Sequence, residues 1–182
     1  TNAPPPLAVV SELSAGRFST TEKGALLEVD GHVVAGGRKF DLKGAWGGYD
    51  YTAGLLERHT AWKWAFGMGR SSDGKPIAYN LTEGFVGARE CVVWRDGAIV
   101  PVGAARFHFD RERLLDPWQI KTDKLDVDFD PASRHEERHN MLVIRSRFQQ
   151  VGGAFRGKLV LPNETVSFEK LPGVTEDQDT LW

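Results

Sequence analysis

The sequence is short of cysteine, of long apolar runs and of excess charge of either sign. Its one cysteine, Cys91, has no second thiol to pair with, which excludes an internal disulfide and gives no reason to expect an oxidising compartment. No apolar run approaches the roughly 18 residues of a membrane span. The formal net charge of -2 gives no general attraction to nucleic acid or to anionic membranes. We therefore expect a cytoplasmic protein with no transmembrane segment and no nucleic-acid partner.

The familiar signatures of nucleotide and nucleophile sites are also missing. The sequence has no nucleophile elbow, no P-loop and no dinucleotide fingerprint. Nothing around Cys91 predicts a lowered thiol pKa, so we interpret this residue as an inert part of a strand. We expect no cofactor.

What the sequence does contain is the composition of one globular domain. It has 182 residues, of which 41% are hydrophobic and 26% are charged. Six tryptophans and ten phenylalanines are many for this length. Large aromatic side chains line both cores and apolar ligand pockets, so either use is open.

The first six residues differ from the rest. The chain begins at Thr1 rather than at Met, and Pro4-Pro5-Pro6 favours an extended polyproline conformation. We interpret residues 1–6 as a linker from an upstream domain or as a frayed terminus. Residues 7–182 are then a single β domain.

A period of two dominates the remaining chain. Asp30-Gly31 and Asp96-Gly97 each lie between two short apolar runs, and Asp-Gly supplies the positive φ angles of a two-residue hairpin. Helical signals are weak by comparison. Further β-rich runs are 7–13, 39–46, 61–67, 77–81, 106–110, 118–122, 125–130, 141–149, 154–161 and 165–169.

About ten strands without a long helix predict an all-β fold, an antiparallel barrel or a strongly curved sheet, because closure removes exposed sheet edges. Such a barrel can hold one small ligand among its inward side chains.

One motif has the spacing of a zinc site. His135-Glu136-Glu137-Arg138-His139 satisfies H-E-x-x-H, which on a helix places two ligands on one face. The segment is almost wholly polar and a strand follows it, so we interpret it as a solvated loop, or a short helix over 133–140, with a chance match. We expect no metal.

A second group combines aromatic rings with acid–base side chains. Trp62 and Trp64 are two residues apart and share one face of a strand, with His59 at its start. Asp50 and Tyr51 lie on a glycine-rich approach, and Trp46 precedes them. These residues can line an apolar pocket in which Asp50 and His59 or Tyr51 move a proton. They can equally be core and turn residues.

A third group consists of polar residues inside β patterns. Each either faces solvent or is buried with a partner. Arg145 and Arg147 share a face and are candidates to pair with Glu83 or Glu90 across the barrel interior. The members that we assign to ligand binding are Asn80, Glu83, Glu90 and Arg147.

Several of these motifs together resemble an uncharacterised, largely bacterial family known only as a domain of unknown function. The resemblance covers roughly residues 40 to 182. It rests on Asp50-Tyr51-Thr52, Trp62-Lys63-Trp64-Ala65, Asn80-Leu81, Trp94 with Asp96-Gly97, Pro117-Trp118, Phe129-Asp130-Pro131, Ser146-Arg147-Phe148 and an ending with Gly173, Glu176-Asp177, Asp179 and Trp182.

The resemblance implies a distant relationship to lipocalin-like (calycin) proteins, which include carotenoid hydratases and some pericyclases. Those proteins pair two barrel-like domains, so the chain would be the C-terminal half of a longer protein and an upstream domain its partner. Their functional region is similar to Trp46, Asp50, Trp62 and Trp64.

Three functions follow as hypotheses. The first is binding of a small apolar molecule, lipid-like or terpenoid-like, in a β-barrel pocket. The second is a cofactor-free hydratase, isomerase or cyclase acting on such a ligand through Asp50 and His59. The third is a structural or interaction domain, which a filled barrel interior would favour.

Overall fold

The computed structural model describes residues 3–182 and is 68% strand. The strands are β1 (Leu7–Glu12), β2 (Phe18–Val29), β3 (His32–Ala35), β4 (Arg38–Asp41), β5 (Ala45–Gly54), β6 (His59–Arg70), β7 (Pro76–Gly84), β8 (Val92–Arg95), β9 (Ala98–Pro101), β10 (Arg106–His108), β11 (Trp118–Lys121), β12 (Leu125–Met141), β13 (Ile144–Val160) and β14 (Thr165–Leu181). Two 3₁₀ turns, η1 (Ser14–Gly16) and η2 (Gly87–Glu90), complete the elements. The predicted all-β class is confirmed.

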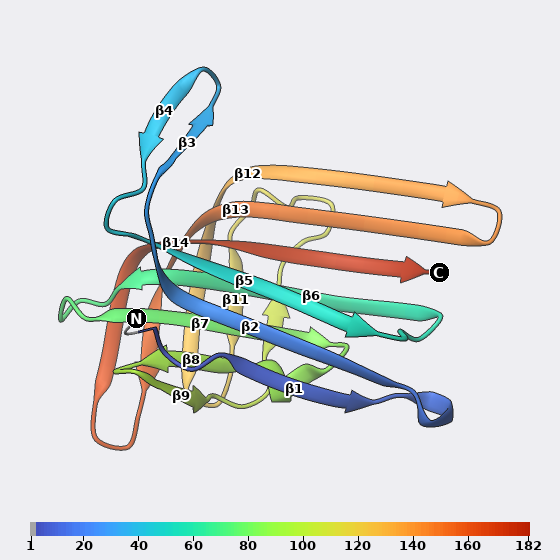
Figure 1. Ribbon diagram of the computed structural model, residues 1–182, viewed down its shortest axis with the longest axis horizontal. Coiled ribbons are helices and arrows are strands. Elements are labelled where there is room, and N and C mark those ends of the chain that lie inside the picture. The colour runs from blue at the N-terminus through green and yellow to red at the C-terminus, as the bar shows by residue number, and fades with distance from the viewer. Residues whose placement is uncertain (1–2) are drawn as a thin grey trace.

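Nine strands form one antiparallel sheet that curls into a half-barrel (Figure 1). Their order is β10-β11-β12-β13-β14-β6-β7-β8-β9. The run β10 to β13 and the run β6 to β9 are each built from neighbours in sequence, and β14 joins the two runs by pairing with both β13 and β6. The middle of the sheet thus comes from the last strand of the sequence.

The sheet bends where small residues stand side by side in its central strands. Gly153 pairs with Gly173, and Gly173 pairs with Gly67 on the next strand. A Cβ atom added to Gly153 would lie 2.3 Å from the Asp130 carbonyl oxygen, and one added to Gly173 would lie 2.2 Å from that of Phe66. Bulges in the pairings of β12 with β13 and of β13 with β14 flank this row, and bulges bend the strands that carry them. Only glycine permits the backbones to approach so closely here.

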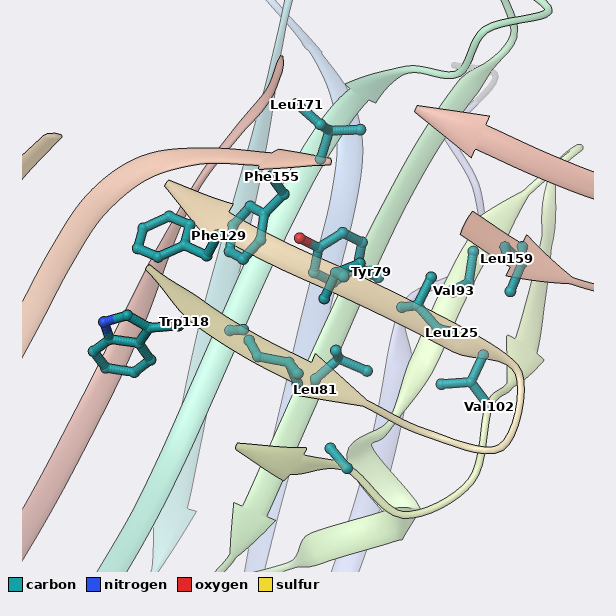
Figure 2. Close-up of a cluster of buried hydrophobic side chains, with 14 of the residues drawn as sticks. Tyr79, Leu81, Val93, Val102, Trp118, Leu125, Phe129, Phe155, Leu159 and Leu171 are labelled. Atoms are coloured by element: carbon teal, nitrogen blue, oxygen red, sulfur yellow. The ribbon is translucent and has the colours of Figure 1, made fainter. Parts of the chain in front are cut away.

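An apolar core fills the inner, concave face of the curl. Figure 2 shows side chains from strands far apart in the sequence meeting there, among them Trp118, Phe129 and Phe155. The rings of Phe129 and Phe155 have centroids 4.4 Å apart, and Tyr79 meets Phe155 edge-on at 5.3 Å. The protein's own side chains therefore occupy the space around these rings inside the half-barrel.

A second, three-stranded sheet of order β1-β2-β5 covers part of the outer face of the large sheet. A separate apolar cluster joins the two sheets; it contains Leu7, Val9 and Ala25 from the small sheet and Ala78, Val92 and Trp94 from the large one. The Trp94 indole also donates to the carbonyl oxygen of Pro5 at 3.0 Å, so the proline segment contacts the fold. The β3–β4 hairpin stands away from both sheets (Figure 1).

Of the two predicted Asp-Gly hairpins, the structure contains one. The hairpin at Asp96-Gly97 is confirmed, because Arg95 pairs with Ala98 and both turn residues have positive φ. The hairpin at Asp30-Gly31 is wrong: β3 pairs with β4 through Gly36-Gly37, and β2 pairs with β1 and β5 instead. Two consecutive glycines adopt the required left-handed φ angles at least cost, which places the turn six residues later.

The expected loop or short helix over residues 133–140 is also wrong. This segment is the outer half of β12, and it forms a long ladder with β13 up to the turn at Leu142-Val143. Two predicted runs also merge into one strand, because most of 141–149 and most of 154–161 belong to β13. Within residues 3–182, the structure contains no helix with the length and apolar character needed to cross a membrane.

Candidate functional site

A pocket of about 140 Å³ lies between the small sheet and the outer face of the large sheet. Strands β2 and β5 form one side, and β6, β7 and β14 form the other. The pocket is on the opposite side of the large sheet from the filled core. Its lining residues are Lys23, Asp50, Thr52, Leu56, Trp62, Trp64, Thr82, Phe85, Glu90 and Glu176.

Lys23 is the only cation among the lining residues, and it is buried. Its position follows from the alternation of β2, in which Ser19, Thr21 and Lys23 point toward the large sheet. The ammonium lies 2.6 Å from Asp50 Oδ2, 3.4 Å from Glu90 Oε2 and 5.2 Å from the centre of the Trp64 ring. Two carboxylates and one ring face thus stabilise a charge that has left water.

Glu90 lies at the end of η2 and is only 2% exposed. Its Oε2 accepts a hydrogen bond from the Thr82 hydroxyl at 3.1 Å in addition to its contact with Lys23. Its Oε1 is buried and has no hydrogen-bond partner. Buried carboxylate oxygens are normally satisfied, so this oxygen is an unused acceptor in a residue that lines the pocket.

Asn80 fixes the relative positions of Glu90 and Trp64. Its side-chain oxygen accepts from the Trp64 indole at 2.6 Å, and its amide donates to the Glu90 carbonyl oxygen at 2.7 Å. Asn80 is fully buried. A single amide therefore couples the aromatic wall to the acidic end of the pocket.

The aromatic walls come from two segments. Trp62 and Phe85 have ring centroids 5.8 Å apart, and Trp64 stacks on Phe66 at 5.9 Å. A smaller adjoining cavity of about 90 Å³ shares Lys23, Asp50 and Trp64 with the main pocket. The walls extend beyond the main cavity along the gap between the two sheets.

Glu176 brings the third carboxyl group to the pocket. It accepts hydrogen bonds from the Gln150 amide at 2.8 Å and from the Trp62 indole at 3.3 Å. Burial raises the pKa of Glu176, the negative charge of Asp50 raises it further, and these hydrogen bonds together with Lys23 oppose the rise. A carboxyl group with a raised pKa in an aromatic pocket holds its proton to a higher pH than a free glutamate does, and such groups are candidates for proton transfer.

The structure brings five of the predicted site residues together. Asp50, Trp62, Trp64 and Glu90 line the main pocket, and Asn80 lines the adjoining cavity. They come from three strands and a 3₁₀ turn, and only Trp62 and Trp64 are close in sequence.

Other predicted residues lie elsewhere. Tyr51 is 61% exposed, next to Asp50 on β5 but outside the pocket. His59 is exposed at the start of β6, where its Nε2 contacts Asp179 at 3.0 Å. Trp46 lies at the far end of β5, with the Arg70 guanidinium 4.8 Å from its ring centre. The structure does not bring His59 or Tyr51 within reach of a ligand in this pocket.

Glu83 and Arg147 are on the inner side of the large sheet. Glu83 pairs with Lys63 and accepts a hydrogen bond from the Phe107 backbone N–H at 2.7 Å. Arg147 lies 3.2 Å from Asp177, which Arg111 also contacts at 2.9 Å. The suggested pairing of Arg147 with Glu83 or Glu90 is therefore wrong, because Arg147 pairs with Asp177 on the adjacent strand β14.

The H-E-x-x-H segment lies on β12 rather than on a helix. The strand period places His135, Glu137 and His139 on one face, where Glu137 contacts His135 at 2.9 Å and His139 at 3.6 Å. All three side chains are exposed. Among residues 3–182, no group of three or more His, Cys, Asp or Glu side chains has an arrangement that could hold a metal ion.

Sequence reasoning missed Lys23, Phe85 and Glu176. Lys23 had a usable signal, since Ser19, Thr21, Lys23 and Ala25 alternate along one strand face. Glu176 had none of that kind, because Pro172-Gly173 and the polar run after it disguise the second half of β14. Phe85 has positive φ at a strand end, and nothing in its neighbours predicts that it turns toward Trp62.

A comparison with protein families matches residues 2–182 to one described as Domain of unknown function (DUF2804). No curated protein and no solved structure matches the chain.

Proposed function

This chain belongs to the DUF2804 family, whose description assigns no activity, and we propose that it binds a small, largely apolar molecule in the pocket between its two sheets. The observation that supports this proposal is the pocket itself. Trp62, Trp64 and Phe85 form apolar walls, and a few convergent polar groups stand at one end, which is the usual composition of a ligand site.

The proposed site differs from the β-barrel interior in which the sequence analysis placed the ligand. The inner face carries the aromatic and aliphatic core (Figure 2), whereas the pocket lies between the outer face and the small sheet, beside the apolar cluster that joins them. Because β5 is an edge strand of the small sheet, a ligand would reach the pocket without separating paired strands of the large sheet. A distant lipocalin relationship remains part of this proposal.

Native mass spectrometry of the purified chain, compared with the same sample denatured, tests the proposal. We expect a small-molecule adduct that is lost in Leu56→Trp, since Leu56 lines the pocket on a loop and a larger ring there would fill it. Leu55→Trp is the matched control, because Leu55 is the neighbouring residue and is 65% exposed.

An adduct that survives in Leu56→Trp would place the ligand elsewhere. Where no adduct is carried through purification, titration with benzyl alcohol followed by tryptophan fluorescence replaces it. Absence of both an adduct and benzyl alcohol binding would overturn the proposal in favour of a structural or interaction domain.

A second function has a specific observation in its favour, namely the raised pKa of Glu176 beside Trp62. In a cofactor-free hydratase, isomerase or cyclase, Glu176 would donate a proton to the ligand and Asp50 would accept one. These two carboxyl groups replace the pair of Asp50 with His59 or Tyr51. Turnover of the identified ligand should then be lost in both Asp50→Asn and Glu176→Gln with folding intact, and unchanged turnover in either would remove that residue from the mechanism.

A further inference from the structure

The pocket carries an excess of acidic groups. Lys23 is its one basic side chain, against the three carboxyl groups of Asp50, Glu90 and Glu176. The chain as a whole has a net charge of only -2. Carboxyl groups therefore outnumber basic groups among the lining residues, whereas the two are nearly balanced over the whole sequence.

The single cation is already committed to the protein. Lys23 contacts both Asp50 and Glu90, and its side chain is 5% exposed. An anionic ligand would have to displace one of these carboxylates and leave it buried without its counter-charge, which is costly. The geometry around Lys23 thus disfavours anions.

Glu90, in contrast, favours a cationic ligand. Its Oε1 has no partner in a side chain that is 2% exposed, and the residue lines the cavity. Leaving a buried acceptor unsatisfied is unfavourable, and more so when it is charged, so a ligand that supplies an N–H donor there removes a penalty. A cation that donates hydrogen bonds meets this requirement best.

The walls suit the same class of ligand. The faces of tryptophan and phenylalanine rings attract cations, and Lys23 already uses the Trp64 face in this way at 5.2 Å. Trp62 and Phe85 form a second aromatic pair beside Glu176. A ligand cation between Trp62, Phe85 and Glu176 would therefore be surrounded by aromatic rings and a carboxyl group, as the Lys23 ammonium is.

We propose that the pocket selects a small organic cation, an ammonium group on an apolar body, with the ammonium at Glu90 and the body between Trp62, Trp64 and Phe85. This inference rests on the proposed binding function and adds the chemical class of its ligand. The cavity of about 140 Å³ is close to the roughly 150 Å³ that holds benzene in another protein, so a benzyl-sized body fits.

Three probes of one size test the charge requirement at neutral pH: benzylammonium, benzyl alcohol and benzoate. Isothermal titration and tryptophan fluorescence are read for each with the full chain. We expect benzylammonium to bind at least about tenfold more tightly than benzyl alcohol, and benzoate to bind more weakly than both.

Variants locate the preference. Glu90→Gln and Glu176→Gln should each reduce the preference for benzylammonium over benzyl alcohol several-fold while benzyl alcohol binding persists, which also shows that the variant is folded. Glu83→Gln is the matched control, because Glu83 is a partly buried carboxylate paired with a lysine on the inner face and away from the pocket. It should leave the preference unchanged.

The outcomes separate this inference from the function beneath it. Equal affinity for benzylammonium and benzyl alcohol would keep the apolar pocket and overturn the cation requirement. Tighter binding of benzoate would overturn it in favour of an anion at Lys23. Failure of all three probes to bind would overturn the inference, and together with the absence of an adduct it would overturn the proposed function as well.

Discussion

The two faces of the nine-stranded sheet use aromatic residues in opposite ways. On the inner face, Phe129, Phe155 and Tyr79 pack against one another in the apolar core. On the outer face, Trp62 and Trp64 stand beside a cavity, and their indole N–H groups hold Glu176 and Asn80. The comparison teaches that the apolar core of the half-barrel serves stability, while the gap between the two sheets contains the aromatic pocket to which we assign binding.

The largest effect should come from the inner face. Phe155→Ala removes a fully buried ring and should lower the free energy of unfolding by about 3–5 kcal/mol. Trp62→Ala removes a partly exposed ring from the pocket and should cost less than half of that, while abolishing benzyl alcohol binding. Urea denaturation of both variants measures the difference; equal costs would mean that the pocket wall is as much a part of the core as the inner face.

A smaller loss is expected from the buried ion pair at the pocket. Lys23→Met leaves Glu90 buried without its counter-charge and should cost about 3 kcal/mol. Lys63→Met is the inner-face equivalent and should cost about 1 kcal/mol, because the side chains of Lys63 and Glu83 are each 23% exposed. Thermal unfolding at fixed pH compares them, and a reversed order would contradict the assignment of the stronger burial to the pocket.

A third experiment uses pH to read the pocket. Burial raises the pKa of Glu176, so the folded protein keeps a proton that the unfolded chain has already released. The contribution of Glu176 to the free energy of unfolding is fully present at a pH below the pKa of the unfolded state. It is lost as the pH rises through the raised pKa of the folded state. The groups that act on it are Asp50, which raises this pKa, and Lys23, Gln150 and Trp62, which lower it.

We therefore expect the contribution of Glu176 to the melting temperature of the native protein to decline above about pH 4.3, and Glu176→Gln to remove this decline. The control is Glu169→Gln, an exposed position on the same strand. A melting profile that keeps its slope in Glu176→Gln would assign the pH dependence to other groups.

The smallest effect should be at Cys91, which follows Glu90 in the chain but points to the inner face. Cys91→Ala should cost about 1 kcal/mol in stability and leave the affinity for benzylammonium unchanged. Calorimetric titration and urea denaturation measure the two quantities. A loss of affinity at this position would show that the two faces are coupled through the backbone of η2.

Much of the fold could be predicted because strand signals are local. The alternation around Trp62 and Trp64 and the turn at Asp96-Gly97 depend on residues that are neighbours in sequence. Asp50 could be predicted as a pocket residue for the same reason, because aromatic residues lie close to it in the sequence. What the alternation could not supply was the side of the sheet on which those residues meet a partner.

The missing parts depend on contacts between distant segments. Lys23 becomes a site residue only because β2 lies over β6 and β7, and Glu176 only because β14 enters the middle of the sheet. The 17-residue strands β12, β13 and β14 also continue through prolines and glycines that normally end a strand, since the bend needs small residues at those positions. Neither the order of the strands nor the position of the bend can be predicted from a single stretch of residues.

The central position of β14 has a consequence for how the protein folds. His59 and Asp179, which are 120 residues apart in the chain, lie on adjacent strands, so the pairing of β6 with β14 closes a very long loop. A topology rich in such pairings folds slowly. During synthesis, β6 to β9 and β10 to β13 would emerge as two separate ribbons, each with an open edge, until β14 arrives to join them. Until then those edges are the surfaces at which the nascent protein is most exposed to misassembly and most dependent on chaperones.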